Sequence, residues 1–353
     1  MRSQTSRITG FLTRCLANFS AVILICSQAT AAPAPSPFAS LATTVDWINN
    51  YRLERPASGA PVAIRALSLH GGFKDPESSG VYVGFIAGLI AANPDRADAL
   101  IEGMFPMREE DHWAIVRGIA YSGHPRWKFL LRKFAPQMPT RAAMIAQYIE
   151  GRLPTLDALV IKPSPTSFQR LRESLFGGDK PKKPQLEPTQ TLLDTLWGFY
   201  LASGDYAPVM TIVAMLPWAN DRDDVEKLTI GSMAKYTLAV NASRDPTLLD
   251  VLKHVRNGKY QSKDVAPALD EVIAAADTAD AGRLRKDALA SIEQLKTKGP
   301  NYKKELSTWG KVGQGALAVG CVAAAATGHV ELGLPCVFGG AGASAVAYYA
   351  NEK

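Results

Sequence analysis

Histidine is the side chain best suited to acid–base and metal chemistry near neutral pH, and the chain has five. They are His70, His112, His124, His254 and His329. No two of them are three or four positions apart, which is the spacing that places two ligands on one face of a helix. The sequence also has no zinc signature. We therefore predict no metal site and no cofactor.

His112 directly follows three acidic residues, Glu109, Glu110 and Asp111. A histidine among carboxylates can act as a general base in a hydrolase. Three acids in a row are also typical of the first turn of a helix, where the N-terminal partial positive charge stabilises them. We favour this structural interpretation. For His124 and His254 we expect positions at helix ends or on the surface.

His70-Gly71-Gly72 is the kind of turn that supplies backbone donors to an oxyanion in some hydrolases. Such an enzyme needs a nucleophile within Gly-x-Ser-x-Gly, and the run at 342–346 lacks the final glycine. The glycine pairs at 71–72, 177–178 and 339–340 also lack the Gly-Lys-Ser/Thr ending of a phosphate-binding loop. We predict a helix stopped by glycine at 70–72 and no catalytic residue.

Residues 1–31 have the three-part pattern of a secretory signal peptide. Arg2, Arg7 and Arg14 precede an apolar run over 19–26, which is too short to span a bilayer, and small residues follow at 29–31. We predict cleavage between Ala31 and Ala32 and a periplasmic or secreted mature chain. Removal of three arginines and no acid lowers the formal charge from +6 to +3, which argues against nucleic-acid binding.

Two of the four cysteines, Cys321 and Cys336, remain after this cleavage. An even number of cysteines in an oxidising compartment favours one disulfide bridge between them. Two buried, unreactive thiols are the alternative. The bridge would close a loop of about 15 residues and stabilise the fold by roughly 3 kcal/mol.

The region around these cysteines, 313–350, is rich in Ala, Gly and Val and almost free of charge. Its small residues recur at four-residue spacing, which lets two helices approach closely; they are Ala316, Gly320, Ala324 and Gly328, then Gly339, Ala343 and Ala347. Gly333-Leu334-Pro335 supplies a turn between them. We predict a helical hairpin that packs on the protein or a partner. Membrane association through 313–350 is the alternative, although each arm is short for a spanning helix.

The elements that position these residues are predicted to be helices, because apolar residues recur at three- and four-residue spacing and strand patterns are sparse. Residues 41–69 are expected to form one or two helices. Most tryptophans fall on apolar helix faces, so we expect them in the core, with one or two beside a concave surface. The other predicted helices are 84–92, 192–201, 209–216, 224–241, 247–255, 265–276 and 281–296.

Two stretches of the chain have the same order of features. Gly84-Phe85 and Gly198-Phe199 each lie in a helix, and each is followed by a break, a helix ending near proline, an acidic patch and a Pro-led helix. We therefore propose a duplicated four-helix module at 80–136 and 191–257, stacked as in an α-solenoid.

The predicted fold class is all-α, with solenoid-like stacked helices and a C-terminal Ala/Gly-rich hairpin. The predicted function is a non-catalytic binding or scaffold protein of the cell envelope, with a protein or an envelope component as partner. The alternatives are a protein that associates with membrane through its hairpin and, third, an envelope hydrolase. The predicted segments are a signal peptide (1–31), a Pro-rich linker (32–40), a helical domain (41–162), a linker (163–190), a second helical domain (191–298) and the hairpin (299–353).

Overall fold

The computed structural model describes residues 37–54, 58–161, 184–221, 223–258, 264–278 and 290. The chain divides into two units, Met1–Ser36 and Pro37–Lys353, and all described residues belong to the second. The predicted signal peptide, the predicted helix 281–296 apart from Ala290, and the Ala/Gly hairpin lie outside the described residues.

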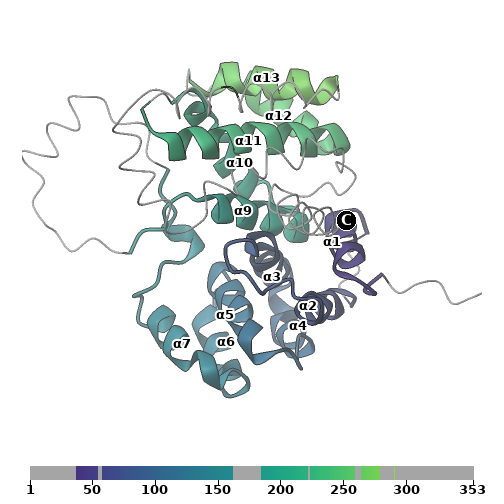
Figure 1. Cartoon of the computed structure of the whole chain (residues 1–353), viewed down its shortest axis with the longest axis vertical. Helices are drawn as coiled ribbons and strands as arrows, with labels where there is room; N and C mark the ends of the chain where they lie inside the picture. The colour runs from purple at the N-terminus through teal and green to yellow at the C-terminus, as the bar shows by residue number, and fades with distance from the viewer. Residues whose placement is uncertain are drawn as a thin grey trace, which may run out of the picture. The chain divides into compact units, whose positions relative to one another are not determined.

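The described part of the chain is built of helices (Figure 1), which confirms the predicted all-α class. Within it, the one pairing of β type is an isolated bridge between Leu159 and Leu186. The helices up to residue 161 are α1 (Leu41–Glu54), α2 (Ala60–Leu69), α3 (Gly80–Ala92), α4 (Ala97–Gly103), α5 (His112–Tyr121), α6 (Trp127–Phe134) and α7 (Ala142–Ile149). The later ones are α9 (Gln190–Ser203), α10 (Ala207–Val213), α11 (Val225–Arg244), α12 (Pro246–Asn257) and α13 (Val265–Asp277).

Side-chain caps explain where the later helices begin. Thr189, Asp224 and Asp245 each accept a hydrogen bond from the backbone N–H three residues on, at the starts of α9, α11 and α12. Gly204 ends α9 with a φ of 70°, a conformation that glycine adopts without steric cost. The predicted helices 192–201, 224–241 and 247–255 therefore each begin within a few residues of a side-chain cap.

Helix α3 is the most apolar helix of the described part, and all of its residues from Gly80 to Ile90 are buried. Its closest neighbour is α9, and the two lie side by side in Figure 1. A Cβ atom on Gly84 would lie 1.9 Å from the carbonyl oxygen of Thr195, and one on Gly198 would lie 1.9 Å from that of Val81. Each glycine thus faces the carbonyl three residues before the other glycine, so the contact is reciprocal.

The flanking glycines show the direction of the pair. A Cβ atom on Gly80 would meet the Thr191 carbonyl oxygen at 2.2 Å, and one on Gly88 would meet that of Phe199 at 2.5 Å. Contacts advance together along both helices, so α3 and α9 run parallel. The missing side chains allow the two backbones to touch.

The two predicted modules each contain four helices in the expected order, α3 to α6 and α9 to α12. Their packing differs, because α5 lies mainly against α3, whereas α11 lies mainly against α13 and the 3-10 helix η6 (Leu216–Asn220). The helices are stacked, but a solenoid is not established. The duplication therefore stays a prediction.

Buried apolar residues form a core cluster that includes side chains from α1 through α13. Trp113, Trp197 and Trp218 are buried in it, and Trp47 and Trp127 pack against it half-buried. Among the described helices, none combines the length and apolar character needed to cross a bilayer.

Candidate binding pocket

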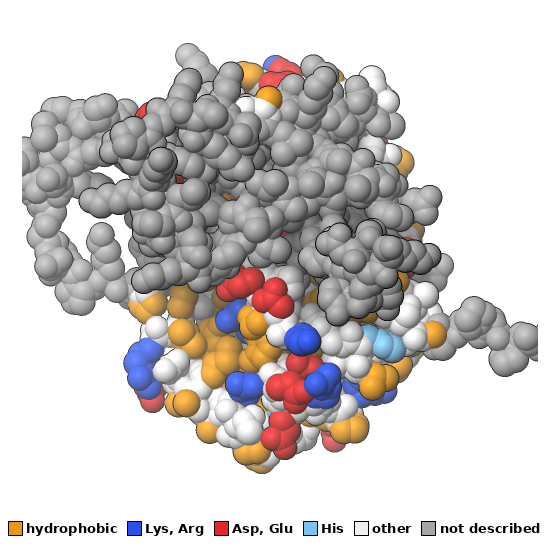
Figure 2. Space-filling view, viewed as in Figure 1, with side chains coloured by type: hydrophobic (Ala, Val, Ile, Leu, Met, Phe, Trp, Pro, Cys, Tyr) orange, Lys and Arg blue, Asp and Glu red, His pale blue; other side chains and the backbone are white. Residues whose placement is uncertain are grey.

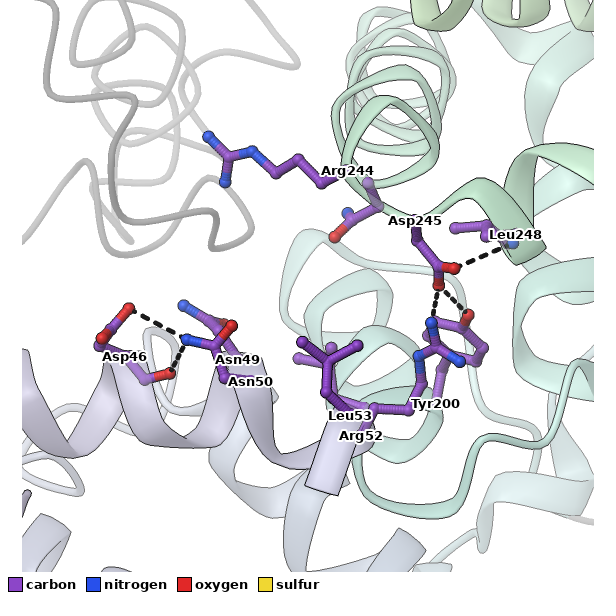
Figure 3. Close-up of a pocket in the computed structure, with 11 residues that line it drawn as sticks. Asp46, Asn49, Asn50, Arg52, Leu53, Tyr200, Arg244, Asp245 and Leu248 are labelled. Atoms are coloured by element: carbon purple, nitrogen blue, oxygen red, sulfur yellow. Dashed lines mark hydrogen bonds and ion pairs between the residues drawn. The ribbon is translucent and has the colours of Figure 1, made fainter. Parts of the chain in front are cut away.

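A cavity of about 500 Å³ with a mixed polar and apolar lining lies where α1 meets α9, α11 and the start of α12 (Figure 3). The cavity is partly enclosed. Its polar lining includes Asp46, Asn49 and Asn50 from α1 and Asn241 and Arg244 from α11; Leu53, Leu201 and Leu248 add apolar surface.

The floor of the pocket is a hydrogen-bonded cluster around Asp245. The carboxylate forms an ion pair with Arg52, and it accepts hydrogen bonds from the Tyr200 hydroxyl at 2.8 Å and from the Leu248 N–H at 3.1 Å. The Arg52 guanidinium also lies over the Tyr200 ring, 5.2 Å from its centroid. The side chains of Arg52 and Asp245 are each 16% exposed. The cluster therefore joins α1, α9 and α12 and leaves few acceptor positions on Asp245.

The electrostatics keep Tyr200 protonated. Burial raises the pKa of its hydroxyl well above the ordinary value, and the hydrogen bond to Asp245 raises it further. Tyr200 is thus a neutral donor at physiological pH. The Asp245 carboxylate accepts from three donors, so it is engaged in joining α1, α9 and α12.

The rim of the pocket carries primary amides that are fixed by their own helices. Asn50 donates from Nδ2 to the Asp46 carbonyl oxygen at 3.0 Å, and Asn241 donates to that of Thr237 at 2.8 Å. Asn50 Nδ2 also donates to Asp46 Oδ1 at 3.4 Å, so Asn50 keeps its carbonyl oxygen as an acceptor, whereas Asn241 keeps a carbonyl acceptor and a second N–H donor. This arrangement suits binding of a ligand with many hydroxyl or amide groups.

A second, more open cavity of about 610 Å³ is mostly apolar. Leu159 and Ile161 line one side, and Leu196, Phe199 and Met210 of α9 and α10 line the other. No titratable cluster surrounds it within the described residues, where Asp157 and Asp205 are the charged side chains at its edge.

The structure places His112 away from both cavities. His112 is buried, its Nε2 lies 3.2 Å from the Met107 carbonyl oxygen, and its ring meets the edge of Phe105. Asp111 accepts a hydrogen bond from Ser68 Oγ at 2.6 Å. In this geometry the serine contacts the carboxylate directly, so a serine–histidine–aspartate relay is not assembled.

The other described histidines have structural contacts. His70 follows α2, Gly71 after it has a φ of 78°, and His70 Nε2 lies 3.0 Å from the Phe38 carbonyl oxygen, which confirms the predicted glycine stop. His124 lies two residues before Arg126, the N-cap of α6, and so near a helix end as expected, but it is buried rather than on the surface. Its Nε2 is 3.2 Å from the Pro94 carbonyl oxygen, and its Nδ1 accepts from the Arg126 N–H. His254 is exposed in the last turn of α12.

Within the described ranges, no three His, Cys, Asp or Glu side chains gather in a way that could hold a metal ion. The predicted cleavage site at Ala31 and Ala32 and the Cys321–Cys336 bridge lie outside those ranges, as do the packing residues Ala316, Gly320, Ala324, Gly328, Gly339, Ala343 and Ala347.

The sequence did not reveal the pocket. Asp245-Pro246 signals a helix start, but Arg52 is 193 positions away and no local pattern links the two. Comparison with known proteins found no family model, no curated protein and no solved structure that matches this chain.

Proposed function

We propose that this chain is an exported, non-catalytic helical protein that binds or scaffolds a component of the cell envelope, and that the pocket between α1, α9, α11 and α12 is its ligand site. The observation that carries the proposal is the make-up of the pocket, in which fixed amides surround a carboxylate that already accepts from three donors. Preformed concave sites with a few placed polar groups are the usual form of a small-molecule site.

The charges of the lining indicate the ligand. Asp46 and Asp245 are balanced by Arg52 and Arg244, so the formally charged side chains sum to zero. A ligand with a large net charge would find no compensating field there. A neutral, hydrogen-bonding ligand such as a saccharide or a peptide segment fits the amides and the adjoining leucines better.

The test uses tryptophan to fill the pocket. Asn50 is exposed and lines the cavity, so Asn50→Trp removes ligand space with little effect on the core. Ser243→Trp adds the same side chain to an exposed position of α11 that does not line the pocket. Thermal unfolding is measured with envelope saccharides and peptides. We expect a stabilising ligand for the wild type and Ser243→Trp, and loss of the shift in Asn50→Trp. Equal shifts in both variants would contradict the assignment of the pocket.

In intact cells, a photoreactive residue at position 50 or 243 gives an independent test. Capture of one envelope component from position 50 and not from position 243 is the expected result. Capture from both positions alike, or from neither, argues against a specific ligand in this pocket.

Export is tested by the N-terminus of the protein recovered from cells. We expect the mature chain to start at Ala32, as shown by N-terminal sequencing of the periplasmic or secreted fraction. A chain that retains residues 1–31 in the cytoplasm refutes export.

A further inference from the structure

The stretch from His112 to Ile149 contains no acidic residue. It includes α5, α6 and α7. Its basic residues are Arg117, Arg126, Lys128, Arg132, Lys133 and Arg141. Such a separation of charge within one chain creates a local positive field that the overall composition does not reveal.

Four of these basic residues are exposed on or beside α6. Leu130, Leu131 and Phe134 are the buried side of this helix. Arg126, Lys128, Arg132 and Lys133 are exposed, and Phe129 among them is 50% exposed. We call these five residues the cationic α6 face.

The other two basic residues belong to the interior contacts of this region. Arg117 is half-buried and lies over the ring of Trp113, 5.1 Å from its centroid. Arg141 is half-buried and donates to the Glu110 carbonyl oxygen at 2.8 Å. These two arginines therefore belong to the packing of the fold and not to the exposed basic surface.

Acidic neighbours neutralise this face only in part. In the described part of the chain, Asp98 of α4 is the acidic residue that pairs with the cationic α6 face. It forms ion pairs with Lys133 and, at 4.0 Å, with Arg126. One carboxylate against four cations leaves a surplus of three positive charges. In Figure 2, basic and hydrophobic side chains lie next to one another over the lower part of the molecule, where Figure 1 places α5 to α7, with acidic ones at intervals.

Phe129 gives this face a hydrophobic point within its charge. The Arg126 guanidinium lies over the Phe129 ring, 5.7 Å from its centroid, so the ring is bordered by a cation and still open to solvent. An exposed aromatic ring among basic side chains is the arrangement with which peripheral proteins enter the headgroup region of a membrane.

We propose that the cationic α6 face docks on the surface of a membrane that contains anionic phospholipid. The basic side chains contact lipid phosphates, and the Phe129 ring enters the boundary between headgroups and acyl chains. A soluble polyanion would satisfy the charges but would leave Phe129 in water. This inference is independent of the candidate pocket and of the predicted C-terminal hairpin.

The test measures binding of the full chain to vesicles of phosphatidylcholine alone or mixed with phosphatidylglycerol. Arg126→Gln with Arg132→Gln removes two charges from the face. The matched control is Lys74→Gln with Lys253→Gln. It removes one exposed charge, Lys74, and one half-buried charge, Lys253, outside the cationic α6 face. We expect about a 25-fold loss of binding to anionic vesicles in the first variant, about fivefold for each basic residue, and little change in the control.

Phe129 provides the second readout. Phe129→Ser should weaken binding to anionic vesicles by about threefold to tenfold, and Phe129→Leu should largely restore it, because an apolar side chain of similar size re-enters the interface. The fold of each variant is checked by circular dichroism. Raised salt should weaken wild-type binding, since exposed charges are screened.

Several results would overturn the proposal. Equal binding to neutral and anionic vesicles removes the electrostatic basis. Equal losses in the α6 variant and the matched control show a general charge effect. If neither raised salt nor the α6 substitutions reduce binding, another part of the chain makes the contact with the membrane. Binding to heparin without binding to anionic vesicles identifies the partner as a soluble polyanion.

Discussion

Replacing Gly84 with alanine tests the close contact between α3 and α9. The new Cβ atom would lie 1.9 Å from the Thr195 carbonyl oxygen and 2.9 Å from the Phe199 backbone nitrogen. An ordinary carbon–oxygen contact is about 3.3 Å, so the helices must move apart by about 1.4 Å. Because the obstacles are backbone atoms in the core, no side-chain rotation relieves the clash.

The cost follows from this separation. Overpacking of a core costs roughly 1–3 kcal/mol, and a gap of about 1 Å along a buried interface removes up to half of its dispersion energy. We assign about 4 kcal/mol to the clash and subtract about 1 kcal/mol for the better helix propensity of alanine. The expected net loss of about 3 kcal/mol is a large part of the roughly 5–15 kcal/mol that stabilises a typical domain.

The assay is urea unfolding followed by circular dichroism, where this loss lowers the midpoint by about 1 M for a slope near 3 kcal/mol/M. Gly198→Ala should cost a similar amount, since its Cβ atom meets the Val81 carbonyl oxygen at the same distance. The double variant should cost less than the sum, because one separation accommodates both methyl groups. Gly103→Ala is the control. Its Cβ atom would lie 3.1 Å from the Pro61 ring, much farther than the 1.9 Å contact at Gly84, so little displacement is needed. A Gly84→Ala chain as stable as the wild type would refute the reasoning.

Three further predictions concern the ion pair, the tyrosines and the cysteines. Arg52→Met should lower the free energy of unfolding by about 2 kcal/mol, because it leaves the largely buried Asp245 carboxylate without its cation. Arg108→Met breaks a pair with Glu110 in which both side chains are more than half exposed, so it should leave the free energy of unfolding nearly unchanged. Urea unfolding compares the two variants, and equal effects would contradict the difference in burial. The free energy of unfolding should fall above about pH 10, because the raised pKa of Tyr200 keeps its proton bound in the folded chain while the unfolded chain releases it. When unfolding is measured against pH, Tyr200→Phe should show a shallower fall than the wild type. Parallel curves for the two proteins would exclude Tyr200 as the cause. The exported chain should have no free thiol under denaturing conditions until it is reduced, as measured by thiol labelling, and two reactive thiols before reduction would refute the Cys321–Cys336 bridge.

The helices were predictable because their signals are local. Spacing of apolar residues and the breaks at Asn93-Pro94, Gly204 and Pro246 mark where helices begin and end, and the structure has them there within a few residues. The start of α3 at Gly80 has no such mark, because this helix is apolar on all sides and carries no amphipathic period.

The pocket was not predictable because it depends on contacts between distant parts of the chain. Arg52 reads as an ordinary basic residue near a helix end, and Tyr200 reads as one more residue of an apolar face. Only packing of α1 against α9 and the start of α12 brings them to Asp245. The burial of His124 has the same origin, since its partner carbonyl belongs to Pro94, 30 positions earlier.

The position of α9 in the sequence has a consequence for how the chain reaches its folded state. Helix α3 packs against α5, but the face that α9 covers stays exposed until α9 is available, and α9 begins only at Gln190. During synthesis, the earlier helices therefore wait for a late partner with one face of their most apolar member uncovered. Non-local contacts of this kind slow folding, and the waiting chain is prone to aggregate. A holding chaperone that covers α3 over this interval would serve the same purpose as α9 does afterwards.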